Sequence, residues 1–490
     1  MSAHNTDNNQ GSIHSAPALS PTIFIIFGIT GDLASRKLLP ALLGLYVKKA
    51  LPKRFSIIGI TRRSFTREEF RESIRSHMHI KQGQFREEDI KHFLDHFTYE
   101  QGMFDDPKLY SNLNASIKAI DDRWGQCSNK LFHLSVPPKL YEGILSNIAH
   151  SSLNVPCADG TGWTRILIEK PFGNDMHTAR SLDKLLGTLF DEEQIFRIDH
   201  YLAKESLQNI MAFRFANSMF EPLWNREYID KIHIKLFEKV TVENRGQFYD
   251  AVGALKDVGQ NHMLAMLALI AMEEPRSFDV SAIRKERAKA LEHLAAITPR
   301  MLEKFIVRGQ YEGYTREAGV QADSDTETYF RIEARIKSPR WKGVPFYMES
   351  GKAFGESRTE IDVYFKGSLC KPGNARTFHG DDPKDIEKQN VLTFRIQPDE
   401  GIKVRFFVKK PGYSMVTEPK TLKYKYADAL VHPDALTDYE RLIHDAFVGD
   451  QTLFASTDEI MASWKFVMPI LDSWEKLPLK IYKKGVQEIE

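Results

Sequence analysis

Residues 197–205 gather side chains that could do chemistry in one short segment, Arg-Ile-Asp-His-Tyr-Leu-Ala-Lys-Glu. A carboxylate such as Asp199 can fix the imidazole of a histidine. A histidine, a tyrosine hydroxyl and a lysine supply converging donors for a phosphate, and His200, Tyr201 and Lys204 have these types. We therefore expect chemistry at Asp199 and His200, although a salt-bridged helix start would have a similar composition.

The residues before this segment alternate between strand-like and helix-like patterns. The apolar run at 22–27, rich in β-branched and aromatic residues, is typical of a buried parallel strand. Further strands are expected at 55–60, 130–136, 165–169 and 195–198, and helices at about 38–46, 66–97 and 107–124. The alternation predicts an α/β fold, in which residues 22–199 form a Rossmann-like, doubly wound parallel sheet that binds a dinucleotide.

After residue 199, strands succeed one another with few helices between them. Alternating strands are expected at 229–238, 329–336, 346–350, 360–365, 391–397 and 402–409, helices at about 246–272, 280–294, 437–447 and 457–474, and loops at 310–326 and 367–388. This order predicts a C-terminal α+β domain over residues 200–485, with a large, mainly antiparallel sheet covered on one face by helices. Residues 1–21 are predicted to be a disordered tail.

The composition is that of an ordinary globular enzyme, since 42% of the 490 residues are hydrophobic and 27% are charged. A net charge of +1 argues against nucleic acid as the main partner. No apolar window approaches the roughly 18 residues of a membrane span, and the N-terminus does not resemble a signal peptide, so we expect a soluble, cytoplasmic protein. Cys127, Cys157 and Cys370 are widely spaced, which suggests a reducing compartment and neither a disulfide framework nor a metal site.

A glycine-containing turn after the first strand could hold a cofactor. Gly28-x-x-Gly31-Asp32, placed between a strand and a helix, has the geometry that cradles a pyrophosphate, although such a pair can also be a plain turn. The second strand leads into Arg62 and Arg63, where NAD enzymes place an acid and NADP enzymes an arginine. We therefore predict NADP. A solvated turn, or use of NAD as well, remains open.

Four ordered motifs together resemble one family. They are Gly28-x-x-Gly31-Asp32-Leu33-Ala34, Glu169-Lys170-Pro171-Phe172-Gly173, the 197–205 segment, and Asp257-Val258-Gly259-Gln260-Asn261-His262. In this order they closely resemble glucose-6-phosphate dehydrogenases, and the resemblance covers about residues 22–475. It implies oxidation of D-glucose 6-phosphate at C1 to 6-phospho-D-glucono-1,5-lactone, with hydride transfer to NADP, the first step of the oxidative pentose phosphate pathway.

The resemblance also implies roles for individual residues. His262 would be the general base, and Asp199 would hold its imidazole and stabilise the imidazolium, as the chemistry of these groups allows. Without the motif, His262 on its apolar helix would be interpreted as a packed histidine. Lys170 would lie near both substrate and cofactor, and Pro171 resembles a family proline that can adopt a cis peptide.

The remaining roles concern binding. The resemblance implies a clamp on the 6-phosphate, formed by His200, Tyr201 and Lys204. It also implies that ring hydroxyls are bound by Glu238 and Asp257, and that Lys352 reaches the substrate from the large sheet. The residues that would bind the cofactor are Gly28, Gly31, Asp32, Leu33, Arg62 and Lys170. Glu238 could equally be a plain exposed acid. Asp257 and His262 are five residues apart, about 140° around an α-helix, so spacing alone does not pair them.

Some features depart from the family or leave alternatives open. A basic residue is expected five positions after Lys352, but Ser357 stands there with Arg358 beside it, so either Arg358 substitutes or one substrate contact is lost. The C-terminal residues lack the ending that accompanies a second, structural NADP, and we do not expect that site. The family associates through the large sheet, which implies a dimer or tetramer. An enzyme with a shifted substrate would be expected to lose the His200, Tyr201 and Lys204 clamp, which is intact. A catalytically dead homologue would be expected to lose His262 or Asp199, and both are present.

Overall fold

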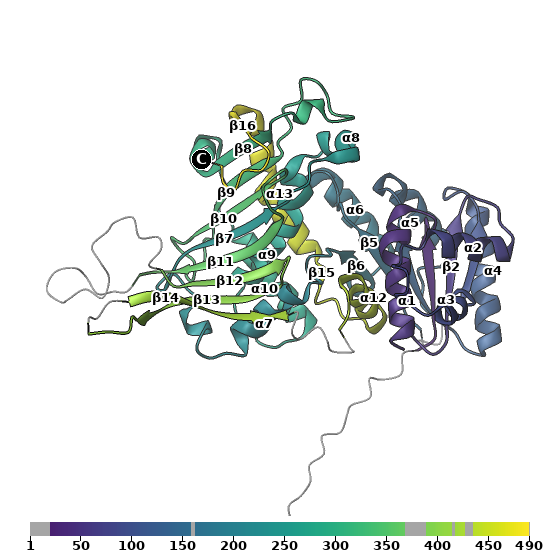
Figure 1. Cartoon of the computed structure of the whole chain (residues 1–490). Helices are drawn as coiled ribbons and strands as arrows, with labels where there is room; N and C mark the ends of the chain where they lie inside the picture. Colours follow the sequence, from purple (N-terminus) through teal and green to yellow (C-terminus); the bar gives the residue numbers. More distant parts are fainter. Residues whose placement is uncertain (1–19, 158–161, 368–388, 414–416, 427–434, 490) are drawn as a thin grey trace, which may run out of the picture. The chain divides into compact units, whose positions relative to one another are not determined.

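The computed structural model describes residues 20–157, 162–367, 389–413, 417–426 and 435–489 (Figure 1). The chain forms two compact units: unit 1 comprises residues 1–133 and 147–164, and unit 2 comprises residues 134–146 and 165–490. Most of the predicted tail and of the predicted 367–388 loop lie outside the described residues. Within the described ranges, no helix is long and apolar enough to cross a bilayer.

Unit 1 is built on parallel strands, as predicted. Its strands lie in the order β3 (Phe97–Gln101), β2 (Phe55–Thr61), β1 (Thr22–Phe27) and β4 (Asn129–Leu134). β1 pairs in parallel with β2, and β2 with β3, and every side chain of β1 and β2 is buried, as their apolar sequences require. The helices are α1 (Leu39–Val47), α2 (Arg67–His77), α3 (Glu87–Leu94), α4 (Pro107–Trp124) and α5 (Tyr141–His150), the last of which passes from unit 2 back to unit 1.

The predicted helix at 66–97 is wrong at its C-terminal end. The charge-rich sequence forms α2 and α3, and Phe97 then begins β3, where it is buried and lies opposite Ile57 of β2. β3 is short and mostly half-buried, so its sequence has only a weak apolar pattern by which a strand could be predicted. Pairing with β2 is what makes this segment a strand.

The prediction that the cysteines provide no disulfide framework is also wrong. Cys127 and Cys157 form a disulfide, with their Cα atoms 6.3 Å apart, a separation that disulfides commonly span. Cys127 lies just before β4. The Lys130 amide of β4 donates to the Trp163 carbonyl, so the segment after Cys157 runs beside the start of β4 and the two cysteines come together. Their 30-residue separation in sequence gave no sign of this, because the pairing depends on a tertiary contact. Cys370 lies outside the described residues.

Unit 2 places two site segments at the ends of neighbouring strands. β5 (Thr164–Glu169) and β6 (Ile195–Ile198) pair in parallel, and the short β15 (Phe454–Ala455) pairs antiparallel with β6. Lys170 directly follows β5 and Asp199 directly follows β6. Because the carboxyl ends of parallel strands meet at one edge, the two side chains are brought close together.

Among the described residues, the second sheet of unit 2 has nine strands and is mainly antiparallel, as predicted; within this part of the chain only β10–β7 and β16–β8 pair in parallel. Along β7, Ile232 and Ile234 are buried while Lys231 and His233 alternate with them toward the other face. β8, β14 and β16 were not predicted. The order is β14 (Thr417–Lys425), β13 (Gly401–Lys409), β12 (Val391–Gln397), β11 (Arg358–Phe365), β7 (Ile229–Phe237), β10 (Pro345–Gly351), β9 (Tyr329–Arg335), β8 (Ile306–Tyr311) and β16 (Leu479–Tyr482).

Helices cover the apolar face of this sheet. Figure 1 shows α9 and α10 behind the strands, and the Phe213 ring of α7 contacts the Phe394 ring of β12 at a centroid distance of 5.3 Å. The helices of unit 2 are α6 (Met176–Leu189), α7 (Glu205–Phe215), α8 (Gly246–Asp250), α9 (Leu264–Ala271), α10 (Val280–Glu292), α11 (Leu302–Phe305), α12 (Asp438–Val448) and α13 (Thr457–Leu471).

The helix predicted at 246–272 is interrupted. α8 ends at Asp250, a π-helix called η6 runs over Leu255–Met263, and α9 follows. Gly253 between them has φ +73°, and a Cβ there would lie 2.5 Å from a carboxylate oxygen of Glu327. That same Glu327 oxygen accepts a hydrogen bond from the Leu255 amide at 2.9 Å. The break therefore requires glycine and fixes where the π-helix begins.

A buried ion pair joins α10 to α13 and allows a stability test. Arg287 is fully buried, and its Nη2 donates to Glu459 at 3.0 Å and to the Phe454 carbonyl at 2.9 Å. We expect Glu459→Gln to lower the free energy of unfolding by about 3–5 kcal/mol, because it leaves the buried guanidinium charge uncompensated. Urea unfolding followed by fluorescence measures this loss. An Arg287→Met/Glu459→Met double variant should lose less, and equal stability of Glu459→Gln and the parent would contradict the prediction.

Candidate active site

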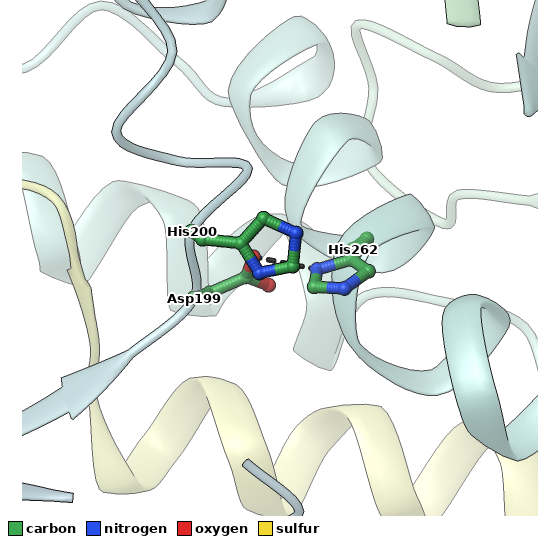
Figure 2. A group of neighbouring side chains, drawn as sticks. All are labelled: Asp199, His200 and His262. Carbon is green, nitrogen blue, oxygen red and sulfur yellow. Dashed lines mark hydrogen bonds and ion pairs between the residues drawn. The ribbon is translucent and has the colours of Figure 1, made fainter. Parts of the chain in front are cut away.

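Asp199 and His262 form a buried hydrogen-bonded pair (Figure 2). Asp199 is 4% exposed and His262 1% exposed, and the His262 Nδ1 atom lies 2.6 Å from Asp199 Oδ1. The Tyr201 amide donates to the same carboxylate oxygen at 2.9 Å. Because a carboxylate accepts, Nδ1 carries the proton and donates it to Asp199. The other ring nitrogen, Nε2, is left to accept.

Lys170 faces that second nitrogen. Its Nζ lies 2.8 Å from His262 Nε2 and also donates to the Asp257 carbonyl at 3.1 Å. The Lys170–Pro171 peptide is cis, as the resemblance suggested, and the indole of Trp464 on α13 donates to the Phe172 carbonyl at 3.4 Å. Two contacts therefore fix the turn that carries Lys170: one from the Lys170 ammonium to the Asp257 carbonyl and one from the Trp464 indole to the Phe172 carbonyl.

The ionisation of the pair follows from burial and charge. Burial lowers the pKa of His262 and the Lys170 ammonium lowers it further, which outweighs the opposing effect of Asp199. Burial would raise the pKa of Asp199, but the hydrogen bond from His262 and the nearby Lys170 ammonium hold the pKa of that carboxyl below its usual value. At neutral pH the pair is therefore a carboxylate beside a neutral imidazole, the form in which His262 can accept a proton at Nε2.

The π-helix η6 brings Asp257 and His262 to one side, which the sequence spacing did not predict. Its i→i+5 hydrogen bonds place residues five apart one turn apart, whereas an α-helix would separate them. Lys170 Nζ consequently contacts both residues, lying 3.8 Å from an Asp257 carboxylate oxygen as well as beside His262. π-Helical turns are frequent at functional sites, and here the turn has a defined geometric effect.

A cavity of about 680 Å³ opens beside this cluster, a size suited to a small-molecule ligand. Arg245 and Lys256 line it and were not singled out from the sequence, because isolated basic residues carry no pattern. With Lys170 they set three cations against two acids, a balance that suits an anionic ligand carrying hydroxyl groups. The predicted site residues in the lining are Lys170, His200, Tyr201, Glu238, Asp257 and His262.

His200 and Tyr201 line the cavity next to the Asp199–His262 pair. The His200 ring lies 4.7 Å from the His262 ring, and burial, together with His262, lowers the pKa of His200 to about 3. His200 is therefore neutral at pH 7 and can donate one N–H. The Tyr201 hydroxyl accepts a hydrogen bond from Gln397 Nε2 at 3.1 Å. Gln397 lies 196 residues away in sequence, and nothing in its local sequence marks it.

The two remaining predicted lysines are already paired with carboxylates. Lys204 Nζ donates to Asp438 at 2.9 Å, and Lys352 Nζ donates to Glu238. The described residues that line the cavity include Glu238 but neither lysine. Asp438 is a partner that sequence reasoning missed.

Arg358, which follows the position where a basic residue is expected, is ion-paired with acids of its own neighbourhood. It begins β11 and forms ion pairs with Glu356 at 3.1 Å and Glu360 at 3.4 Å, while Ser357 Oγ accepts from the Lys239 amide. The Arg358 charge is therefore engaged on the sheet.

Unit 1 carries the predicted cofactor turn. Gly28 has φ +77° and its amide donates to the Ile60 carbonyl, so the ends of β1 and β2 lie together. Helical structure follows Gly31 from Asp32 and Leu33 onward, and Asp32 forms an exposed ion pair with Arg36. Arg62 is exposed just after β2. A glycine turn, a helix N-terminus and an exposed arginine at adjacent strand ends suit a dinucleotide phosphate site.

Asp199, His200 and His262 have the composition of a metal site, with candidate ligand atoms within 4.8 Å of one another. The Asp199–His262 hydrogen bond uses one ligand atom of each residue, and the Lys170 ammonium lies against the other His262 nitrogen. A cation at that position repels a metal ion. The arrangement therefore fits proton transfer better than metal binding.

The contact between Lys170 and His262 predicts a measurable titration. Removing the ammonium in Lys170→Gln should raise the pKa of His262, because the charge that disfavours the imidazolium is lost. Histidine ¹H–¹⁵N NMR as a function of pH measures this change. Lys256→Gln is the control, since it removes a charge from the same cavity at a residue without the His262 contact. An unchanged His262 titration in Lys170→Gln would refute the assignment.

Comparisons with known proteins agree with this geometry. A solved structure of glucose-6-phosphate dehydrogenase in complex with its substrate glucose-6-phosphate is 32% identical, with a TM-score of 0.87 and 97% of each chain covered. The Mycobacterium avium glucose-6-phosphate 1-dehydrogenase structure is 33% identical, with a TM-score of 0.80 and 95% of each chain covered.

Sequence relatives extend the agreement. Glucose-6-phosphate 1-dehydrogenase of Aggregatibacter actinomycetemcomitans is 41% identical over 91% of this chain and 90% of its own length, and that of Chlamydia pneumoniae is 38% identical over 95% and 92%. The family model for the NAD binding domain of glucose-6-phosphate dehydrogenase matches residues 25–209, and the model for its C-terminal domain matches residues 211–489. The chain therefore belongs to the glucose-6-phosphate dehydrogenase family.

Proposed function

We propose that the chain is a glucose-6-phosphate 1-dehydrogenase, which oxidises D-glucose 6-phosphate at C1 to 6-phospho-D-glucono-1,5-lactone in the oxidative pentose phosphate pathway. The observation that carries this proposal is the buried Asp199–His262–Lys170 cluster at the wall of a cavity lined by cations and hydrogen-bonding groups. A solved relative, covered over 97% of its length, is in complex with glucose-6-phosphate.

The chemistry at His262 follows from its protonation state. His262 Nε2 accepts the proton of the C1 hydroxyl as the C1–H bond breaks and the C1–O bond becomes a carbonyl. Asp199 stabilises the imidazolium that forms, because its carboxylate already accepts from Nδ1. A bound nicotinamide dinucleotide supplies the acceptor for the hydride. Lys170, whose ammonium touches Nε2, yields this position to the hydroxyl and remains beside the reacting atoms.

The rest of the site binds and orients the sugar phosphate. His200, Tyr201 and Lys204 form the clamp on the 6-phosphate. Glu238 and Asp257 accept hydrogen bonds from ring hydroxyls. Lys352, directly after β10, reaches the substrate from the large sheet, and its ammonium also donates to Glu238. Binding energy from the remote phosphate then orients C1 toward the base.

The preferred cofactor is NADP. Gly28, Gly31, Asp32 and Leu33 form the turn that receives the pyrophosphate, and Lys170 contributes from the substrate side. Arg62 is exposed where the 2′-phosphate of a bound dinucleotide is expected.

Three further features belong to the same proposal. The domain boundary lies between residues 199 and 200, the location is cytoplasmic, and the chain forms a dimer or tetramer through the outer face of the large sheet. That face carries polar groups such as His233, whose Nε2 lies 2.8 Å from Glu349, and these groups suit a second polar surface better than an apolar core.

The function is tested by following absorbance at 340 nm with glucose 6-phosphate and NADP, for the parent and for His262→Asn. We expect clear turnover by the parent and a kcat/KM lower by about 10²- to 10⁴-fold in the variant, since a general base is lost. His293→Asn, at the end of α10, is the control and should retain activity. Full activity of His262→Asn would exclude His262 as the base, and no turnover by the parent would exclude the proposed substrate.

Cofactor preference is tested by Arg62→Ala. We expect the ratio of kcat/KM for NADP to kcat/KM for NAD to fall about 10- to 100-fold, because charge-assisted hydrogen bonds to the 2′-phosphate are lost while NAD has no such group. Arg67→Ala, which removes an exposed arginine at the start of α2, serves as the control. An unchanged ratio in Arg62→Ala would show that Arg62 does not read the phosphate.

A further inference from the structure

The lysine of the phosphate clamp is occupied by a carboxylate of the same chain. Lys204 Nζ lies 2.9 Å from Asp438 Oδ2, and the Lys204 side chain is only 10% exposed. Its ammonium sits 5.7 Å from the centre of the Tyr201 ring, yet Tyr201 lines the cavity and Lys204 does not. The clamp is therefore incomplete as long as the ion pair persists.

Asp438 is held where it can make this contact. It is the first residue of α12, whose N-terminus is closed by Thr437 and Glu440 in a capping box. A negative side chain is favoured at this end of a helix. The next residue, Tyr439, donates its hydroxyl to Glu169 at 3.2 Å, so the start of α12 is attached to the segment that carries Lys170.

The surroundings of Lys204 add further negative charge. Burial raises the pKa of Glu400, and the charges of Asp438 and Glu205 raise it as well, while Lys204 opposes them. Asp438 itself is 37% exposed, so a ligand can reach the ion pair from solvent. A phosphate that approaches Lys204 must either displace the Asp438 carboxylate or bind beside a like charge.

We propose that Asp438 is a specificity-determining residue that competes with the substrate phosphate for Lys204. The proposal rests on the proposed function, and in particular on Lys204 as part of the phosphate clamp. Asp438 holds the ammonium outside the cavity until a phosphate dianion, with its greater charge and three acceptor oxygens, takes its place. The ion pair thereby weakens binding of the sugar phosphate without touching the groups that react.

The test compares Asp438→Asn with the parent in steady-state kinetics. We expect KM for glucose 6-phosphate to fall about two- to fivefold, the range expected for a partly exposed ion pair, with kcat and the cofactor KM unchanged. The kcat/KM for free glucose, which has no phosphate, should not change. Asp458→Asn, in the first turn of α13, is the matched control and should leave every constant unchanged.

A double-mutant cycle with Lys204→Gln separates the possible failures. Lys204→Gln should raise KM for glucose 6-phosphate about 10- to 100-fold, and Asp438→Asn should then have no further effect. If Lys204→Gln leaves KM unchanged, the assigned clamp is wrong. If it raises KM but Asp438→Asn leaves KM unchanged or raises it, Asp438 is not a competitor, and the proposal is overturned while the proposed function stands. Asp438→Glu keeps the charge and should behave as the parent.

Discussion

The burial of one carboxylate beside one imidazole is the constraint on which the rest of the site depends. A charge with 4% exposure is costly unless its lone pairs are used, and Asp199 meets this cost through His262 Nδ1 and the Tyr201 amide. Both partners must therefore be placed to within about 0.5 Å. The strand end that carries Asp199 and the helix that carries His262 leave little freedom once this hydrogen bond forms.

Neighbouring structure can be understood as support for that hydrogen bond. Gly253 and Glu327 set the start of the π-helix, and the π-helical turn aligns Asp257 with His262 so that Lys170 reaches both. Arg197, two residues before Asp199, is anchored by Glu192 and Asp183 at 2.9 Å each. An ordinary α-helix at 255–263 would be simpler to form, but it would turn one of the two residues away from Lys170.

Parts of this arrangement follow from local sequence, and parts do not. A strand such as β1 was predictable because all of its residues are buried and all but Thr22 are apolar, whereas β14, from Thr417 to Lys425, is largely exposed and has no apolar pattern to detect. His262 and Asp199 could be predicted because they lie in motifs. Gln397 and Asp438 could not, because they meet Tyr201 and Lys204 only through tertiary contacts across about 200 residues of chain. The π-helix was missed because helical spacing rules assume α-helical turns.

The strands and helices that complete the site come late in the chain, and this has a consequence for biosynthesis. β15 pairs with β6 directly before Asp199, Trp464 supports the turn that carries Lys170, and the Tyr482 hydroxyl donates to the Lys352 carbonyl at 2.8 Å. The ribosome makes residues 170–262 well before residues 454–482, and early segments tend to fold first. A nascent chain therefore holds its reactive side chains for many seconds without the elements that position them. The supports that Trp464 gives to the Lys170 turn and that Tyr482 gives to Lys352 therefore form last.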